Sequence, residues 1–354
     1  MQLLSMHFVK IAERKIGPGH PCFIIAEAGV NHNGDLAMAQ QLVTQACLAG
    51  ADCIKFQTFK AERVAAGIAP KAAYQLRSTD PTESQFAMLR KLELTESDHR
   101  VLLEQCRREG IFFLSTPYSL ADAELLHALD VPAFKIASGQ LIELPFLAAL
   151  ARFNRPVILS TGMGTLAEVK EAVDTLRAHG NQQLVVLQCT TNYPSRLADT
   201  NLRAMATLAA ATGTAVGYSD HTEGITACLA AVALGACVIE KHFTLDRTMP
   251  GPDHRCSSEP AELTALVRGI RDIEISLGDG VKRPAETELA NLTGVRRSIA
   301  TARDLPAGHV IGERDLQFLR PATGLPPRDW DRVVGRRTTT ALAGGTLLAW
   351  EHLA

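Results

Sequence analysis

Residues 214–244 read TAVGYSDHTEGITACLAAVALGACVIEKHFT. The first and last parts of this stretch are short apolar runs, as expected for strands that are buried on both faces. GITACLAAVAL lies between them and predicts a buried helix, which ends at Gly235 because glycine commonly caps helix C-termini. The stretch therefore predicts a strand, a helix and a second strand.

Working outward from this unit, six earlier runs have the same character. They are CFIIAEAGVNH (22–32), ADCIKFQT (51–58), IFFLSTP (111–117), PAFKIASG (132–139), PVILSTGMG (156–164) and LVVLQCTTNYP (184–194). Stretches with apolar spacing near 3.6 residues, such as TLAEVKEAVDTLRAHG (165–180), separate them and predict helices. Eight alternating strands and helices predict an α/β fold, the (β/α)8 TIM barrel, with its reactive groups at the C-terminal ends of the strands.

Composition narrows the class of protein. The chain has 354 residues and a formal net charge of −2, so it lacks the basic surface that nucleic acid binding requires. Its eight cysteines show no CxxC spacing, which favours a reduced, cytoplasmic setting. The N-terminal MQLLSMHFVKIAERK has charged residues before any apolar segment long enough for a secretory signal, so no such signal is expected. We expect a soluble protein.

The pattern of apolar runs, polar residues and turn residues divides the chain into three parts. We expect the catalytic barrel over 1–280, a polar linker over 281–293 and a small β-rich domain over 294–354. A segment at 60–94 is too long for a bare connection and predicts a functional loop over the barrel mouth. The C-terminal module buries little surface alone, so we expect it to pack on another surface, such as a second subunit.

Two histidines at the ends of the last two strands predict a metal site. His221 follows the seventh strand and His242 ends the eighth. Two imidazoles at adjacent strand ends can bind one divalent cation and leave open positions for water or substrate. The alternative is a hydrogen-bonded pair without metal. His32 and His254 are expected to be solvated loop residues.

Lysines and hydroxyls at the other strand ends predict an anion site. Lys55, Lys135 and Lys241 lie within apolar strands, where a cation is costly unless it meets an anion. Ser138, Ser160 and Ser219 supply hydroxyls beside backbone N–H groups, which suit phosphate. The alternative places lysine stems along the rim with their amines in water, and Lys241 fits that alternative best.

Two carboxylates complete the candidate site. Glu27, at the end of the first strand, is the best candidate for a general acid or base, although it could instead pair with a lysine. Asp253, in the loop after the eighth strand, could bind the metal or orient a substrate hydroxyl.

The motifs AEAGVNHNGD, KFQTFKAE, FKIASG, LSTGM, CTTNYP, GYSDHT and EKHFT resemble those of the sialic acid synthase family. The resemblance runs in order from about residue 20 to the C-terminus. The tail, with LRPATGLPPRDW at 319–330, resembles the family's antifreeze-like (SAF) domain. The resemblance implies that phosphoenolpyruvate condenses with the aldehyde of an N-acetylated hexose such as N-acetylmannosamine, and that phosphate is released.

The resemblance also implies roles for matching residues. His221 and His242 would bind a divalent metal, Mn2+ in the first instance, with Mg2+ or Co2+ as alternatives. The phosphate of phosphoenolpyruvate would contact Lys135, Ser138, Ser160 and Ser219, and its carboxylate would contact Lys55 and Thr116. The sugar would contact Glu27, Tyr193 and Asp253. Arg320, in the SAF loop, would reach the sugar bound by the partner subunit of a domain-swapped homodimer.

This sequence departs from the family pattern at two positions. Gln140 stands where many members carry an acidic residue, so any role of a base at that position must move to Glu27, Asp253 or water. Thr191 stands where some members have Asn, and the shorter threonine side chain extends less far toward the phosphate.

Three other functions remain open, the first of them within the family that the sequence resembles. One is a legionaminate or other nonulosonate synthase with a different acceptor sugar. Another is a barrel aldolase that forms a Schiff base through Lys135 or Lys55. The third is a non-catalytic carbohydrate-binding or ice-binding relative, although such a protein would not need the histidine pair and the buried lysines.

Overall fold

The computed structural model describes residues 8–354. Residues 1–7, the start of the segment expected to lack a secretory signal, lie outside the described residues. Residue contacts divide the chain into two compact units, 1–278 and 279–354. Within residues 8–354, no helix is both long and apolar enough to cross a membrane.

The first unit is built around one sheet of eight strands, in the order β5-β4-β3-β10-β9-β8-β7-β6. The hydrogen-bonded neighbours in this sheet are parallel, and β5 also lies against β6, which closes the barrel. The prediction of a TIM barrel is confirmed. The strands are β3 (Phe23–Gly29), β4 (Cys53–Thr58), β5 (Phe112–Pro117), β6 (Phe134–Ile136), β7 (Val157–Ser160), β8 (Leu184–Cys189), β9 (Ala215–Asp220) and β10 (Val238–His242).

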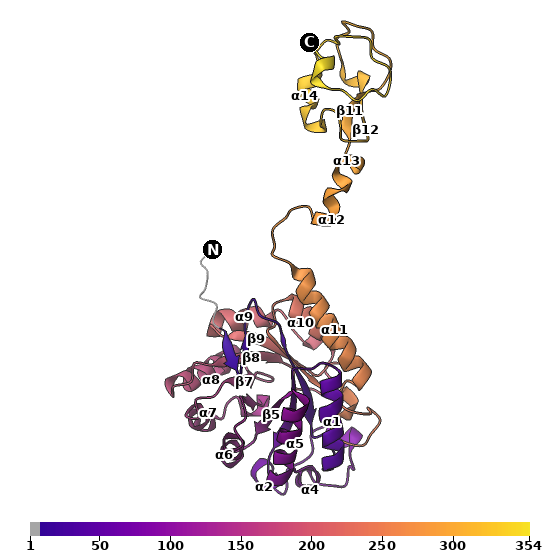
Figure 1. The fold of residues 1–354 in the computed structure, drawn as a ribbon. Coiled ribbons are helices and arrows are strands. Elements are labelled where there is room, and N and C mark those ends of the chain that lie inside the picture. Colours follow the sequence, from indigo (N-terminus) through magenta and orange to yellow (C-terminus); the bar gives the residue numbers. More distant parts are fainter. Residues whose placement is uncertain (1–7) are drawn as a thin grey trace. The chain divides into compact units, whose positions relative to one another are not determined.

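Helices surround the strands (Figure 1). The main ones are α1 (Leu36–Leu48), α5 (Glu96–Glu109), α6 (Leu120–Ala128), α7 (Leu144–Ala151), α8 (Leu166–Ala178), α9 (Ala204–Thr212), α10 (Thr226–Ala233) and α11 (Pro260–Leu277). Helix α8 begins with a capping box between Thr165 and Glu168, which satisfies N–H groups that the first turn leaves free.

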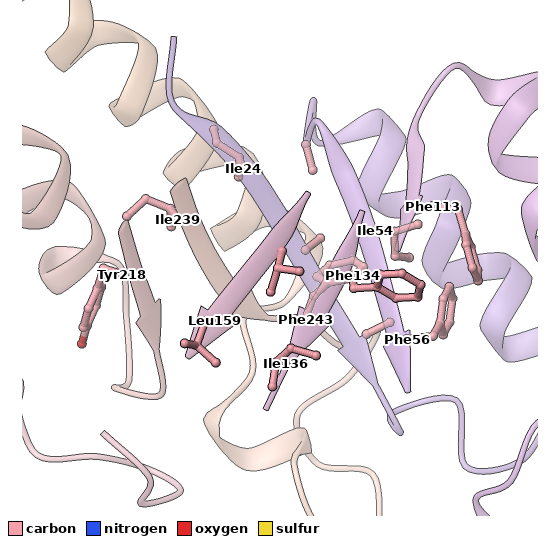
Figure 2. Packing of buried hydrophobic residues seen from close by; sticks show 14 of the residues in the cluster. Ile24, Ile54, Phe56, Phe113, Phe134, Ile136, Leu159, Tyr218, Ile239 and Phe243 are labelled. Carbon is pink, nitrogen blue, oxygen red and sulfur yellow. The ribbon is translucent and has the colours of Figure 1, made fainter. Parts of the chain in front are cut away.

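Alternation along the strands creates two apolar layers. Outward-facing residues such as Ile24, Phe56 and Phe113 pack between the strands and the helices (Figure 2). Inward-facing residues such as Phe23 and Ile158 form a separate cluster inside the barrel. Successive side chains of a strand point to opposite faces, so residues two apart along each strand belong to the same layer.

A short N-terminal hairpin was not predicted. Strands β1 (Val9–Ile11) and β2 (Arg14–Ile16) pair antiparallel. Val9, Ile11 and Ile16 join the cluster inside the barrel, so the hairpin extends the interior core. Strands of three residues are too short to show a period in the sequence.

The 60–94 segment is folded rather than bare. It contains three short helices, α2 (Ala61–Val64), α3 (Gln75–Ser78) and α4 (Gln85–Lys91). Val30, Phe59, Met88 and Leu92 form a small apolar cluster that joins α4 to the loops after the first two barrel strands.

The second unit has its own core. Strands β11 (Ser298–Thr301) and β12 (Leu316–Leu319) pair antiparallel, and helix α14 (Trp330–Val333) follows. Ile299, Ile311, Val333 and Leu348 are among its buried residues. Two short helices, α12 (Glu286–Leu289) and α13 (Asn291–Val295), begin within the segment 281–293 that is predicted to be a linker, and α13 extends two residues beyond it.

Candidate active site

The inward face of each barrel strand changes from apolar to polar toward its C-terminal end. Ile25 is followed two residues later by Glu27, Cys53 by Lys55, and Val238 by Glu240 and His242. The side chains at these strand ends line one cavity of about 290 Å³. The barrel interior is therefore packed at one end and open to a ligand at the other.

Most residues predicted for the site line this cavity. They are Glu27, Lys55, Thr116, Lys135, Ser138, Ser160, Thr191, Tyr193, Ser219, His221, His242 and Asp253.

Two predicted residues lie elsewhere. Gln140 ends a 3-10 turn, Ser138–Gln140, whose first two residues line the cavity. The side chain of Gln140 is itself buried and is not among the residues that line the cavity. Arg320 is an exposed residue of the second unit.

A chain of buried charges crosses the cavity floor. Lys55 Nζ lies 2.5 Å from Glu27 Oε2 and 3.7 Å from Glu240 Oε2. Lys135 Nζ lies 3.5 Å from Glu240 Oε1, which also accepts a hydrogen bond of 3.0 Å from the Ser219 hydroxyl. Burying charges is costly unless they are paired, and here two lysines and two carboxylates balance before any ligand binds.

The two carboxylates have shifted pKa values in opposite directions. Burial raises the pKa of Glu27 to about 7, with Lys55 opposing the shift and Glu240 adding to it. Burial also acts to raise the pKa of Glu240, but Lys135 and Lys55 outweigh it and hold that pKa below its usual value. Glu27 is thus placed to exchange a proton near neutral pH, whereas Glu240 stays ionised.

Lys241 does not belong to the anion site. Its ammonium group lies on the outer face of the barrel, 2.8 Å from Asp220 Oδ2, and also contacts the carbonyl of Thr222. Alternation along β10 explains this, because Glu240 and His242 face inward and the residue between them must face outward. The amine is fully buried, so the rim alternative does not apply either.

The ends of β6 and β7 form a cradle of hydroxyls. Lys135 Nζ donates to the Ser160 hydroxyl at 2.7 Å, and the backbone N–H of Gly162 donates to the Ser138 hydroxyl at 2.9 Å. A Cβ at Gly162 would come within 2.1 Å of Thr191 Oγ1, so only glycine allows these groups to approach one another. The arrangement suits a tetrahedral anion such as phosphate.

The two predicted histidines face each other. The rings of His221 and His242 have centroids 5.0 Å apart, and Tyr193 packs against both. His221 Nδ1 lies 2.7 Å from the carbonyl of Thr190, which leaves its Nε2 for another ligand. His242 Nδ1 is buried without a hydrogen-bond partner. Burial lowers the pKa of His242 well below its usual value, so this ring is neutral.

His32 and His254 are buried, contrary to the prediction that they are solvated. Both have an exposed fraction of 1% or less. His32 Nδ1 accepts from the N–H of Gly34 at 3.0 Å, and His254 Nδ1 lies 2.6 Å from the Thr244 hydroxyl. Burial lowers the pKa of each to about 4. The loops at the barrel mouth pack tightly enough to exclude water from these rings.

Several cavity residues were missed by reasoning from the sequence. Strand alternation could have found three of them. Glu240 lies two residues before His242, Gln57 two residues after Lys55, and Cys189 two residues after the inner-core residue Leu187, so each shares the inner face of its strand. Tyr74 and Tyr118 come from loops, where no periodic signal exists. Tyr74 stacks on Tyr193 with ring centroids 4.7 Å apart, which brings the 60–94 segment over the histidine pair.

Comparison with known families assigns both units. The NeuB family model matches residues 42–282, and the SAF domain model matches residues 296–354. The chain belongs to the NeuB family. The resemblance to sialic acid synthases and to their SAF domain is confirmed.

NeuB-family relatives match over nearly the whole chain. An N,N'-diacetyllegionaminic acid synthase of Legionella pneumophila is 47% identical, covering 95% of this chain and 96% of the relative. The human N-acetylneuraminate-9-phosphate synthase is 36% identical, covering 92% of this chain and 90% of the relative. The crystal structure of the spore coat polysaccharide biosynthesis protein SpsE of Bacillus subtilis aligns with a TM-score of 0.68 at 36% identity, covering 98% of this chain and 99% of that one.

Proposed function

We propose that this NeuB-family protein is a nonulosonic acid synthase that joins phosphoenolpyruvate to an N-acetylated hexose. The observation that carries the proposal is a single cavity that holds a lysine and serine cradle for phosphate, a paired lysine and threonine, and two facing histidines. The relatives support it, because their names describe synthases of N,N'-diacetyllegionaminic acid, pseudaminic acid and N-acetylneuraminate 9-phosphate.

The proposed reaction balances without an oxidant or reductant. C3 of phosphoenolpyruvate forms a bond to the aldehyde carbon of the sugar, and the aldehyde oxygen takes up a proton. Water adds to C2, and the bond between C2 and the bridging oxygen breaks so that phosphate leaves. The oxygen from water becomes the keto oxygen of the product, and its protons pass to the aldehyde oxygen and to phosphate.

The chain's own residues would bind and align the two substrates. Lys135, Ser138 and Ser160 would hold the phosphate, and Lys55 with Thr116, whose hydroxyl lies 3.1 Å from Lys55 Nζ, would hold the carboxylate. Glu27 would exchange the proton of the acceptor oxygen, because its pKa of about 7 permits both protonation states at neutral pH. Alignment of this kind can contribute several orders of magnitude to rate.

The histidine pair fits a divalent metal, for which we propose Mn2+, with Mg2+ and Co2+ as alternatives. His221 and His242 would be its ligands, since His242 is neutral and its Nδ1 is unpartnered. Within residues 8–354, no cluster of three or more His, Cys, Asp or Glu side chains suits a metal, so water or substrate would complete the coordination. The metal would supply Lewis-acid activation of the sugar aldehyde.

For the acceptor we propose a di-N-acetylated hexose, with N-acetylmannosamine as the second candidate. The support is that the relatives from Legionella pneumophila and Campylobacter jejuni, at 47% and 46% identity, are N,N'-diacetyllegionaminic acid synthases.

We also propose a domain-swapped homodimer in a reducing cytoplasm. In such a dimer the exposed Arg320 of one subunit would contact the sugar held by its partner. The eight cysteines are all free thiols, which supports a reducing compartment.

Phosphate release from phosphoenolpyruvate tests the proposed function. The purified protein would be given each acceptor with Mn2+ and then with excess EDTA, and the product would be identified by mass. We expect release only with acceptor and metal, and a loss of at least about a hundredfold in His221→Ala and His242→Ala. Turnover that survives EDTA, or covalent trapping of pyruvate by borohydride, would instead indicate the Schiff-base aldolase.

A further inference from the structure

Part of the cavity wall is apolar, and we call this part the apolar side chamber. Its residues are Val30, Phe59, Val64, Met88, Leu89 and Leu92. Val30, Phe59, Met88 and Leu92 are themselves buried and pack together, so the chamber walls are held by the core of the 60–94 segment. None of the residues that the reaction uses lies in this group.

Three glutamines also line the cavity, and one of them, Gln57, contacts the charged floor. Gln57 Nε2 donates to Glu27 Oε1 at 3.3 Å, and Gln57 Oε1 accepts from the Tyr118 hydroxyl at 3.4 Å. Gln75 Oε1 accepts from Gln85 Nε2 at 3.2 Å. All three line the cavity, so they present amide donors and acceptors beside the apolar walls.

This combination selects a particular chemical group. The described lysines that line the cavity are Lys55 and Lys135, and both are paired with carboxylates on the floor, so the chamber offers no cation for a second phosphate. A hydroxyl buried against the four buried side chains of the chamber would lose its hydrogen bonds to water without replacement. An acetamido group has an amide that glutamine can bond and a methyl that apolar walls favour.

We propose that this chamber is the acyl-specificity subsite of the enzyme, in which the methyl of an acetamido substituent on the acceptor sugar lies against Met88 while Gln57, Gln75 and Gln85 bond the amide. The inference rests on the proposed function and adds to it the residues that read the acyl group. Val30, Phe59, Met88 and Leu92 all belong both to the cavity wall and to the buried cluster, and Met88 is the test position because it is the one of the four with a flexible, unbranched side chain.

A series of acceptors with different acyl chains tests this subsite. The full-length protein, with Mn2+ and phosphoenolpyruvate, would be assayed with N-acetyl, N-propanoyl and N-butanoyl forms of mannosamine and of 2,4-diamino-2,4,6-trideoxymannose. We expect wild-type kcat/KM to fall as the acyl chain grows. Met88→Ala should raise the ratio of butanoyl to acetyl kcat/KM by about tenfold, since it makes room for about two methylenes. Val64→Leu narrows the chamber and should shift the same ratio in the opposite direction.

Met163→Ala is the matched control, because Met163 also lines the cavity but lies beside the phosphate cradle. This variant should leave the acyl ratio at its wild-type value even if it changes the KM for phosphoenolpyruvate. The subsite would be overturned, and the proposed function left intact, if Met88→Ala and Val64→Leu turned over substrate with the wild-type ratio of butanoyl to acetyl kcat/KM. It would also be overturned if Met163→Ala shifted that ratio as much as Met88→Ala does. Absence of phosphate release by wild type with every acceptor would overturn the proposed function and the subsite with it.

Discussion

Lys241 Nζ lies 2.8 Å from Asp220 Oδ2 on the outer face of the barrel, and the two residues are direct register partners across β9 and β10. The residue after each of them is a histidine of the candidate metal site, His221 and His242. The ion pair therefore joins the two strands at the point where both imidazoles enter the cavity. Tyr218 supports it with a hydrogen bond of 2.9 Å to Asp220 Oδ1.

Removing one partner of this pair should be costly. We expect Lys241→Met to lower the free energy of unfolding by about 3–5 kcal/mol, because Asp220 is left as an unpaired buried charge. The double variant Asp220→Asn with Lys241→Met should recover part of that loss. Urea denaturation measures both. Lys170→Met, in an exposed pair with Asp174 at 3.8 Å, is the control and should change stability by less than about 0.5 kcal/mol. If Lys241→Met lost no more stability than the control, the ion pair would not be what joins the two strands.

Glu240 should set the affinity of the anion site. Its carboxylate faces both Lys55 and Lys135, so it opposes the negative charge of phosphoenolpyruvate. Glu240→Gln keeps the shape and an acceptor for Ser219 but removes one negative charge. We expect the Kd for phosphoenolpyruvate alone, measured by calorimetry, to fall by about tenfold, which corresponds to a binding free energy more favourable by about 1.4 kcal/mol. Glu223→Gln, an exposed residue, is the control. Weaker binding in Glu240→Gln would show that the carboxylate mainly positions the lysines.

Gly162 should not tolerate a side chain. A Cβ there would lie 2.1 Å from Thr191 Oγ1 and 2.8 Å from Ser138 Oγ, inside the proposed phosphate cradle. We expect Gly162→Ala to raise the KM for phosphoenolpyruvate by at least about tenfold. The added methyl would push Thr191 and Ser138 away from their positions in the cradle, and such overpacking costs free energy. Steady-state kinetics with varied phosphoenolpyruvate measure this effect. Gly67→Ala meets no atom within 4 Å and is the matched control. Similar KM values in both variants would argue against the cradle.

His32 should make the barrel less stable in mild acid. Burial lowers its folded-state pKa from 6.5 to about 4, so the unfolded chain binds a proton more readily between these values. Stability from this group is present above pH 6.5 and is lost as the pH falls toward 4, by about 2 kcal/mol between pH 7 and pH 5. His32→Asn retains an acceptor for the N–H of Gly34 and should reduce this pH dependence.

Urea midpoints at pH 7 and pH 5 measure the effect of His32→Asn. The same substitution at His179, which is exposed, is the control. An unchanged difference between the two midpoints in His32→Asn would show that His32 is not protonated on unfolding in this range.

The order of the strands along the chain and many of the polar residues of the cavity wall could be predicted from the sequence. Continuous apolar runs identify strands that are buried on both faces, and polar residues at their ends meet at one mouth because parallel strands run in one direction. These two rules were enough to predict that Glu27, Lys55, Lys135 and the histidine pair line the cavity. It did not reach Tyr74, whose place over Tyr193 depends on how the 60–94 segment folds back.

The sequence by itself determined which segments are strands and at which end their chemistry lies, because both follow from hydrophobic pattern and chain direction. The tertiary structure alone decided which partners the buried charged groups meet. Alternation from the predicted position of His242 puts Glu240 on the inner face and Lys241 on the outer face, but it does not say which charge each of them faces. Closure places Glu240 between two lysines inside the barrel and Lys241 against Asp220 outside it.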